Sequence, residues 1–231
     1  MMTTEVTVLR VFTDINGKFG NPLGVIDAAV VQAADYQQIA TRLGFTQTVF
    51  VEPPQPDSAT ATANVRIFTP TAESAFVGQP AVGAAWWLRN RGTPIRSLQP
   101  PAGVVEVNYA AELAIIYASA SWTPEFVLHE LNSPHDVMDA DPDDYFDGAP
   151  HYVWAWINRG AGYLRSRSFT PELGVHDDEA TGAAAIRITA QLRRGLTITQ
   201  GKGSLIHTRW SASGGVGIGG RVVRQGLVHL V

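Results

Sequence analysis

Residues 66–70, Arg-Ile-Phe-Thr-Pro, recur at residues 167–171 as Arg-Ser-Phe-Thr-Pro, and a run of small residues follows each copy. These runs are Ala81–Ala85 (AVGAA) and Ala180–Ala184 (ATGAA). The two arginines lie 101 residues apart and the glycines of the two runs 99, so both matches agree in register to within two residues. Two matches in register predict an internal repeat, that is, a chain of two similar halves.

The residues around the repeat predict an α+β fold in which strands dominate and each half has one buried helix. Strands rich in β-branched residues do not alternate regularly with helices, as they would in a parallel βαβ fold. We place the halves at residues 1–108 and 109–231, with an approximate boundary and a last strand that can return to the first half.

Three helices are expected. In Asp35–Leu43 the apolar residues follow helical spacing, and Gly44 is a natural terminator. Pro80–Arg91 begins with proline and is apolar nearly all round, including Trp86 and Trp87, so we expect it to be buried. Ala180–Arg194 is the corresponding helix of the second half.

Several other segments are expected to be strands or loops. Strands are predicted at residues 6–12, 23–28, 48–51, 64–68, 98–119 and 152–157, and Pro53–Thr60 is expected to be a loop. Asp136–Asp147, with six aspartates, is expected to be an exposed acidic loop, and Leu196–Val231 a set of short strands. Gly214–Gly220 lacks the Lys-Ser/Thr of a phosphate-binding loop and is interpreted as strand turns or bulges.

Composition excludes several classes of function. The chain has no cysteine, which rules out thiolate nucleophiles, cysteine zinc sites and two-thiol racemase chemistry. A formal charge of −4, without a basic stripe, argues against nucleic-acid binding. No signal peptide or long apolar segment is apparent, so a cytoplasmic protein without membrane contact is expected.

The two small-residue helix starts are candidate anion-binding sites. Free backbone N–H groups and the positive end of the helix dipole attract an anion there, and Gly83 and Gly182 allow close approach of a ligand. The alternative is that the small residues only let the buried helices pack tightly against the sheet. The repeat by itself does not favour either interpretation.

The chain also resembles the phenazine-biosynthesis PhzF family, which has the diaminopimelate-epimerase-like fold. The matching motifs occur in the family's order over nearly the whole chain. They are Gly20-Asn21-Pro22, Arg66–Pro70 with Glu73, Phe76–Pro80 (FVGQP), Asp178–Ala183 (DEATGA) and Gln200-Gly201.

The resemblance implies two pseudo-symmetric domains, each a curled, mainly antiparallel sheet around a central helix, with a ligand site in the interdomain cleft. It also implies a homodimer. The family includes an isomerase that moves a proton along its substrate without a cofactor. In that isomerase a glutamate acts as base and acid, supported by a histidine, an aspartate and a serine.

This sequence departs from the family pattern where the chemistry lies. Gln47 stands at the glutamate position, Gln79 at the histidine position and Ala183 at the serine position; Asp178 alone is kept. A neutral amide cannot take up a proton near neutral pH, so Gln47 is not competent as a general base. Glutamine does keep much of the shape and hydrogen-bonding capacity of the residues it replaces.

Among the remaining titratable residues, Asp178 and Glu73 are the candidate bases. The alternative for Asp178 is a helix-capping acid, and for Glu73 a structural hydrogen bond or plain exposure. His176 is a remote substitute for the missing histidine. No metal or cofactor site is expected. The expected substrate-binding residues are Asn21, Gly78, Gln79, Gly83, Thr181, Gly182 and Ala183.

Three functions therefore remain open. The first is a PhzF-like protein that binds a small carboxylate-bearing metabolite but has lost or altered the usual proton transfer. The second is an active cofactor-independent isomerase that uses Asp178 or Glu73. The third is a non-catalytic structural or partner-binding dimer.

Overall fold

The computed structural model describes residues 4–54, 61–170 and 175–230, and within these ranges the chain forms two compact units. Unit 1 contains residues 1–11, 21–117 and 221–231, and unit 2 contains residues 12–20 and 118–220. Three segments therefore make up unit 1, because the end of the chain returns to it. Each unit is described by itself.

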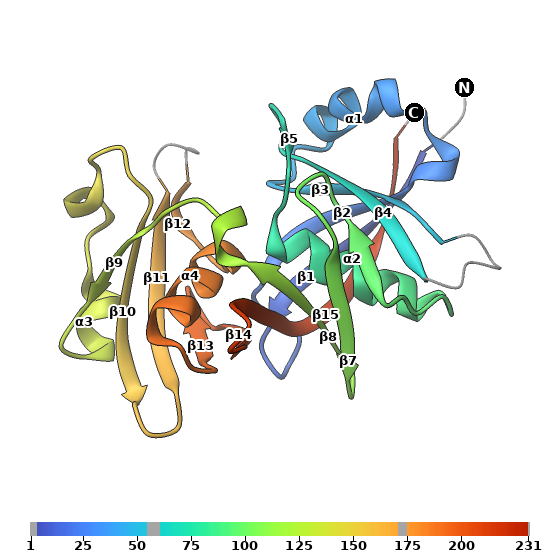
Figure 1. Cartoon of the computed structure of the whole chain (residues 1–231). Helices are drawn as coiled ribbons and strands as arrows, with labels where there is room; N and C mark the ends of the chain where they lie inside the picture. Colours follow the sequence, from blue (N-terminus) through green and yellow to red (C-terminus); the bar gives the residue numbers. More distant parts are fainter. Residues whose placement is uncertain (1–3, 55–60, 171–174, 231) are drawn as a thin grey trace. The chain divides into compact units, whose positions relative to one another are not determined.

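Unit 1 contains most of the first half of the chain (Figure 1). Its elements are β1 (Thr4–Thr13, in unit 1 to residue 11), β2 (Asn21–Asp27), η1 (Ala28–Val30), η2 (Ala33–Asp35), α1 (Tyr36–Leu43), β3 (Thr48–Glu52), β4 (Thr62–Phe68), β5 (Glu73–Ser74), α2 (Gly78–Asn90), β6 (Ser97–Gln99), β7 (Val105–Ala110), β8 (Leu113–Ser119, in unit 1 to residue 117) and the second part of β15 (Gly215–Leu230).

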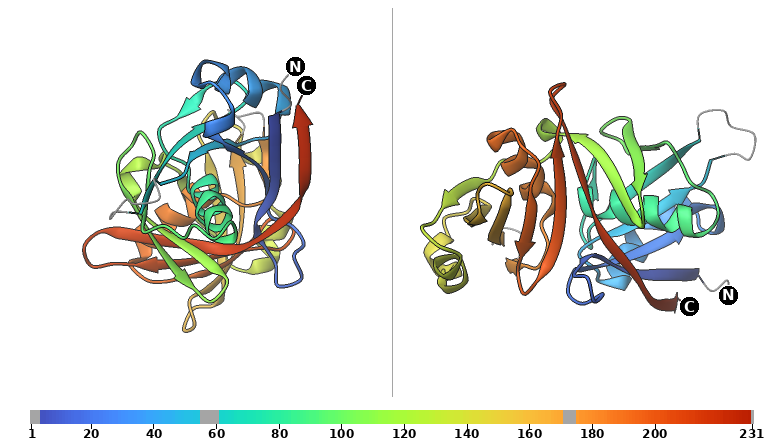
Figure 2. Two further views of the ribbon diagram at one scale, coloured as in Figure 1. Left: turned by 90° about the vertical axis from the view of Figure 1, so that its right-hand side faces the viewer. Right: turned by 90° about the horizontal axis from the view of Figure 1, so that it is seen from below.

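The strands of unit 1 form a closed circuit around α2. Their order is β1-β2-β3-β4-β6-β7-β8-β15, and an additional pairing joins β15 to β1. The left view of Figure 2 shows α2 end-on with strands of this unit around it. Because every side of α2 faces sheet, its first eleven residues are buried except for the half-buried Trp86. The apolar character of Pro80–Arg91 thus predicts its environment correctly.

The helix α1 packs on β3 and β4 through one face. Tyr36, Ile39 and Ala40 are its buried residues, and Gly44 ends the helix in the left-handed conformation, with φ 66°. Those buried residues have the i, i+3, i+4 spacing of one helical face. Both the helix and its terminator are confirmed.

Unit 2 has an open mixed sheet with α4 and α3 packed on its strands. Its elements are η3 (Ala120–Trp122), β9 (Val127–Glu130), α3 (Pro134–Asp139), η4 (Pro142–Tyr145), β10 (His151–Asn158), β11 (Tyr163–Thr170), β12 (Val175–Asp178), α4 (Gly182–Leu192), β13 (Thr197–Gln200), β14 (Ser204–Trp210) and the first part of β15. The strand order is β15-β14-β13-β11-β10-β9, with β12 paired to β11.

Two expectations for unit 2 are wrong. The acidic segment Asp136–Asp147 is not a plain loop but carries α3 and η4, because Ser133 and Asp141 cap these short helices and Val137 is buried under the segment. The prediction of short strands over Leu196–Val231 holds for β13 and β14 but is wrong for β15, which runs for 16 residues and is drawn as one long red strand in Figure 2. Its glycines at 217–220 continue the strand rather than break it.

The remaining expectations on secondary structure agree with the described residues. The predicted strands correspond to β1 to β4, β6 to β8 and β10, and the helix at Ala180–Arg194 is α4, which begins two residues later. Most of the predicted loop Pro53–Thr60 lies outside the described residues, as does Pro171 of the second signature. The sheet-dominated α+β class is confirmed.

Candidate functional site

In unit 1 the signature arginine is held in place by a carboxylate. Arg66 lies on β4, and β5 pairs with β4 so that Phe68 is opposite Glu73. The guanidinium donates to Glu73 through Nε–Oε1 and Nη2–Oε2, both at 2.7 Å, and lies 5.2 Å from the Phe68 ring centre. The hydrogen bonds from Arg66 hold the pKa of Glu73 below its ordinary value. A carboxylate stabilised in its charged form is a poor base, which favours the structural alternative for Glu73.

In unit 2 the second signature arginine makes the same kind of contacts and more of them. Arg167 donates to Asp177 Oδ2 at 3.0 Å and lies 4.9 Å from the Phe169 ring centre. Its Nη1 also donates to the carbonyl oxygens of Met138 at 3.1 Å and Ala140 at 2.6 Å, at the end of α3. Both signature arginines therefore organise structure around an aromatic ring.

Gln79, which the sequence motifs predict to stand at the family histidine position, lies near the start of α2. It is 4% exposed, and its Nε2 is 3.3 Å from the carbonyl oxygen of Asn21 and 3.4 Å from that of Pro22. A glutamine amide can donate to these carbonyls at any pH, whereas it cannot exchange a proton with a substrate. Gln79 thus ties the helix start to the Gly20-Asn21-Pro22 motif.

Gly83 is required by packing. A Cβ at this position would lie 2.3 Å from Leu23 Cδ2 and 3.2 Å from Val11 Cγ2. Such a separation from Leu23 is far inside van der Waals contact, so α2 approaches β1 and β2 as closely as it does only because residue 83 has no side chain. At Gly83 the helix-packing alternative is therefore favoured.

Gln47, which the sequence motifs predict to stand at the family glutamate position, precedes β3 in unit 1. Its Oε1 is buried and has no hydrogen-bond partner within the described part of the chain. An amide oxygen only accepts hydrogen bonds, so any further partner of this atom must be a donor.

A chain of buried hydrogen bonds leads to Asp178 at the start of α4. Thr181 Oγ1 donates to Asp178 Oδ2 at 2.6 Å and accepts from Gln200 Nε2 at 2.8 Å. Gln200 Nε2 also donates to the Asp178 carbonyl at 2.8 Å, and its Oε1 lies 3.3 Å from the Tyr152 hydroxyl. Asp178 is partly exposed, whereas Gln200 and Tyr152 are fully buried.

This chain fixes which group donates at each link. Burial raises the pKa of the Tyr152 hydroxyl above its ordinary value, so it stays protonated. The Thr181 hydroxyl has one proton and directs it to the Asp178 carboxylate, because Gln200 supplies a donor to the same oxygen. The hydrogen bond from Thr181 therefore fixes the position of one Asp178 side-chain oxygen.

The neighbouring carboxylate, Glu179, has a structural role. Its oxygens accept from the backbone N–H of Lys202 at 3.0 and 3.1 Å and from Ser204 Oγ at 2.8 Å. The same hydroxyl accepts from the backbone N–H of Gly20 at 2.9 Å. Gly201 allows this contact, since a Cβ there would lie 2.6 Å from Glu179 Oε2.

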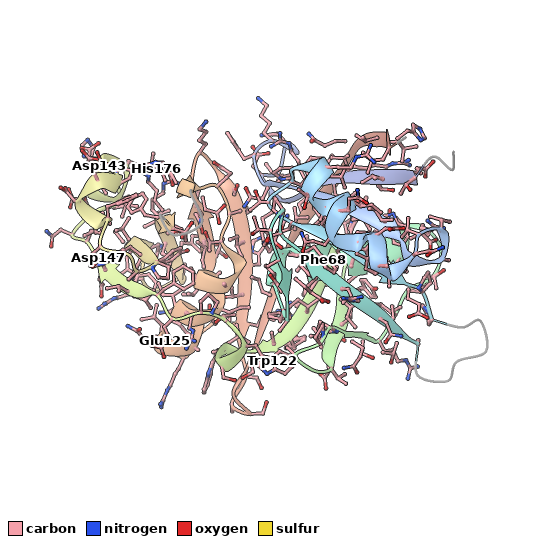
Figure 3. The ribbon with its side chains drawn as sticks, turned by 90° about the horizontal axis from the view of Figure 1, so that it is seen from above. Phe68, Trp122, Glu125, Asp143, Asp147 and His176 are labelled. Carbon is pink, nitrogen blue, oxygen red and sulfur yellow. The ribbon has the colours of Figure 1, made fainter. Side chains whose placement is uncertain are left out.

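The other sequence candidates are placed as follows. His176 is exposed and stacks on Phe146, with ring centres 5.7 Å apart; Figure 3 shows it in unit 2 near Asp143. No group of three or more metal-ligating side chains occurs among the described residues. Unit 1 contains Asn21, Gln47, Glu73, Gly78, Gln79 and Gly83, and unit 2 contains Asp178, Thr181, Gly182 and Ala183.

Sequence reasoning did not find two members of the Asp178 chain as functional residues. Gln200 was noted only as part of Gln200-Gly201, and Tyr152 only as the start of a strand. Tyr152 lies in a mainly apolar strand, where a polar residue is a local signal, whereas Gln200 ends the strand Thr197–Gln200 (TITQ), which gives no such signal. Their partners lie 19 to 48 residues away in sequence, so the pairing itself is a tertiary property.

Comparison with solved structures identifies the fold. A putative phenazine biosynthesis PhzC/PhzF protein from Clostridium difficile matches with a TM-score of 0.78 at 20% identity, over 99% of each chain. A hydroxyproline epimerase from Agrobacterium vitis matches with a TM-score of 0.65 at 10% identity, over 99% of this chain and 92% of that one. The fold is therefore that of the PhzF proteins and of the related epimerases.

Comparison of sequences identifies the family. The family model PhzC-PhzF, phenazine biosynthesis-like protein, matches residues 9–116. Antisense-enhancing sequence 1 of Schizosaccharomyces pombe is 38% identical over 217 residues, which cover 72% of this chain and 73% of that protein. Trans-2,3-dihydro-3-hydroxyanthranilate isomerase of Pseudomonas aeruginosa is 26% identical over 219 residues, covering 79% and 78%. The chain belongs to the PhzC-PhzF family of isomerase-like proteins, as the sequence motifs predicted.

No helix among the described residues has the length and apolarity needed to cross a membrane.

Proposed function

We propose that this chain binds a small carboxylate-bearing metabolite and does not carry out the glutamate-dependent proton transfer of its family. The observation that carries the proposal is Gln47. It occupies the position that the resemblance assigns to the glutamate, and its Oε1 is buried without a partner in the described residues. Such an atom accepts a hydrogen bond from a ligand or water but cannot take up the substrate proton.

The binding part of the proposal is supported by polar groups in each unit. In unit 1 these are the backbone N–H groups at the start of α2 and the Gln47 amide. In unit 2 they are the start of α4, with Thr181 oriented by Gln200. Free N–H groups at a helix start, together with the positive end of the dipole, suit a carboxylate.

A second candidate function is an isomerase that uses Asp178 as its base. Asp178 is partly exposed. Of the four family positions compared above, the resemblance leaves only this aspartate unchanged, which favours the isomerase function. The hydrogen bond from Thr181 opposes it, because one oxygen of the Asp178 side chain is already engaged as an acceptor. Glu73 is a weaker candidate still, since both of its oxygens are bound to Arg66.

Deuterium exchange tests both functions. Trans-2,3-dihydro-3-hydroxyanthranilate, the compound named for the Pseudomonas aeruginosa relative, and trans-4-hydroxy-L-proline, the compound bound in the hydroxyproline epimerase structure, are incubated with the protein in D2O. Proton NMR then follows deuterium uptake, and calorimetry follows binding. We expect saturable binding of one compound and no exchange above the rate in buffer.

Two variants make the result specific. Exchange by the natural chain that Asp178→Asn abolishes would replace our proposal with the Asp178 isomerase. If neither compound binds nor raises the melting temperature, the binding proposal is wrong for these compound classes. That result would support a structural or partner-binding function instead. Gln47→Leu removes the unpartnered amide oxygen. We expect this variant to bind the ligand about tenfold more weakly, which corresponds to the loss of one hydrogen bond between neutral groups.

A further inference from the structure

A pocket in unit 1, outside every residue discussed for the family site, lies where two neighbouring parallel strands end. Its volume is about 570 Å³. Its walls combine small apolar side chains with two carboxylates and one tyrosine. The lining residues are Asp27, Ala28, Ala29, Val31, Ala33, Tyr36, Glu52, Pro53 and Pro54.

The strand pairing explains why two carboxylates meet here. Parallel pairing of β2 with β3 places Asp27 beside Val51, so Glu52 is the next residue along the neighbouring strand. Each acid is the last residue of its strand. Parallel neighbours end at the same edge of a sheet, and these two therefore bring both acids to one edge.

The two carboxylates differ in the hydrogen bonds and ion pairs that they already make. Asp27 accepts from the backbone N–H of Ala29 at 3.1 Å and pairs with Arg91 at 3.3 Å. Among the side chains that the structure describes, Glu52 accepts from the neutral amide of Asn64, at 3.1 Å. Within residues 4–54, 61–170 and 175–230 no cationic side chain is paired with Glu52, and the pocket wall has no lysine, arginine or histidine. The pocket therefore carries one uncompensated negative charge.

Tyr36 is the second, independent feature of this pocket. The residue is 6% exposed and lines the pocket, and its hydroxyl makes no hydrogen bond to the described residues. Burial raises the pKa of this hydroxyl, the Arg66 cation opposes that rise and the Glu52 carboxylate adds to it, so the hydroxyl is protonated and offers an acceptor lone pair. The hydroxyl oxygen is not itself fully buried, so a group that enters the pocket can bind it.

The ring faces of Tyr36 are already occupied. Phe50 stacks on the ring with centres 3.8 Å apart, the Arg66 guanidinium lies 5.4 Å from its centre, and Phe68, labelled in Figure 3, meets it edge-on. A ligand cation consequently reaches the hydroxyl and the Glu52 carboxylate rather than a ring face. This arrangement favours a cation with N–H donors over a quaternary ammonium that depends on cation–π contact.

We propose that this pocket binds a small primary amine, with its ammonium group donating to Glu52 and the Tyr36 hydroxyl and its apolar body against the alanine and proline walls. The site is independent of the proposed carboxylate function, because it uses none of the same residues. A volume in the range of ordinary small-molecule sites, apolar walls and a few polar groups are the features expected of such a site.

Two-dimensional NMR with n-butylammonium as the probe tests the site. We expect saturable shifts of backbone amides at the ends of β2 and β3, weakened by added salt because the attraction is between charges. n-Butanol, n-butyrate and butyltrimethylammonium serve as matched probes and should shift these amides far less. Equal shifts by n-butanol or n-butyrate would show that charge does not select the ligand and would overturn the proposal. Stronger binding of butyltrimethylammonium would overturn the N–H-directed geometry.

Variants then test the two polar groups. Glu52→Gln keeps the side-chain size and should weaken n-butylammonium binding roughly tenfold, whereas Tyr36→Phe keeps the ring stack and should weaken it about threefold. Glu106→Gln, an exposed acid on β7 of the same unit, is the control and should change nothing. Unchanged affinity in Glu52→Gln, with the control also unchanged, would reject the site.

Discussion

The two copies of the Arg-x-Phe-Thr-Pro signature build similar local structures but differ in how much of the surrounding structure depends on them. In both units the arginine lies over the phenylalanine two residues later and pairs with a carboxylate from an adjacent strand. The Arg66 side chain is 42% exposed and binds Glu73 alone, whereas the Arg167 side chain is 12% exposed and also binds the end of α3. The repeat therefore conserves a structural contact.

The helix starts that follow the two signatures differ in chemistry. The start of α2 contains a buried neutral amide, Gln79, bonded to backbone carbonyls. The start of α4 follows a carboxylate, Asp178, that is linked through Thr181 and Gln200 to a buried tyrosine. The difference shows that a repeated backbone arrangement can support unlike polar groups, and that function is decided by those groups.

Removing the signature arginines should give the largest difference between the units. Arg167→Ala leaves Asp177 and the α3 carbonyls without their donor, and we expect a loss of about 3 kcal/mol in the free energy of unfolding. Arg66→Ala breaks a largely exposed pair and should cost less than about 1 kcal/mol. Urea denaturation measures both, with exposed Arg224→Ala as the control. Equal losses for the two arginines would contradict the comparison.

Replacing Gln79 at the start of α2 and Gln200, which contacts the start of α4, should give a smaller difference in the free energy of unfolding between the units. Gln200→Leu removes the buried amide that donates to the Asp178 carbonyl and to Thr181 Oγ1, while the Tyr152 hydroxyl keeps its hydrogen bond to Ser166 Oγ at 2.8 Å; we expect a cost of about 2 kcal/mol. Gln79→Leu removes two long hydrogen bonds of 3.3 and 3.4 Å and should cost only about 1 kcal/mol. Thermal and urea unfolding provide the measurement. A larger cost for Gln79→Leu would mean that the unit 1 start is the more strongly ordered one.

The acid partners of the two arginines should have opposite, small effects on pH dependence. Arg66 lowers the pKa of Glu73, so its contribution to stability is present above the unfolded pKa and is lost as pH falls through the folded pKa. Burial raises the pKa of Asp177 despite Arg167, so that stability is lost as pH rises from the unfolded pKa through the folded one.

Denaturation from pH 3 to pH 7 separates these two effects. Glu73→Gln should reduce the fall in stability on acidification, and Asp177→Asn should remove a fall on going from acid toward neutral pH. Matched slopes in the two variants would show that the carboxylates have the same environment.

Local patterns sufficed to predict much of the fold. The spacing of Tyr36, Ile39 and Ala40, with Gly44 after them, defined α1, and the all-round apolarity of α2 predicted its burial. The prediction for Asp136–Asp147 was less accurate. Helices as short as α3 and η4 are stabilised by single capping residues and by the burial of Val137, and neither produces a periodic sequence pattern. The length of β15 depended on partners from β14, β8 and β1.

By itself, the sequence determined the repeat, the α+β class and the PhzC-PhzF family, and it predicts glutamines at the positions of the family glutamate and histidine. These follow from residue identity and short-range periodicity. Only the tertiary structure decided that Glu73 is bound to Arg66, that Gly83 serves packing, that Gln200 orients Thr181 toward Asp178, and that Asp27 and Glu52 share a pocket with Tyr36. Each of these depends on which distant residues come within hydrogen-bond or van der Waals distance, and strand pairing and burial set those distances.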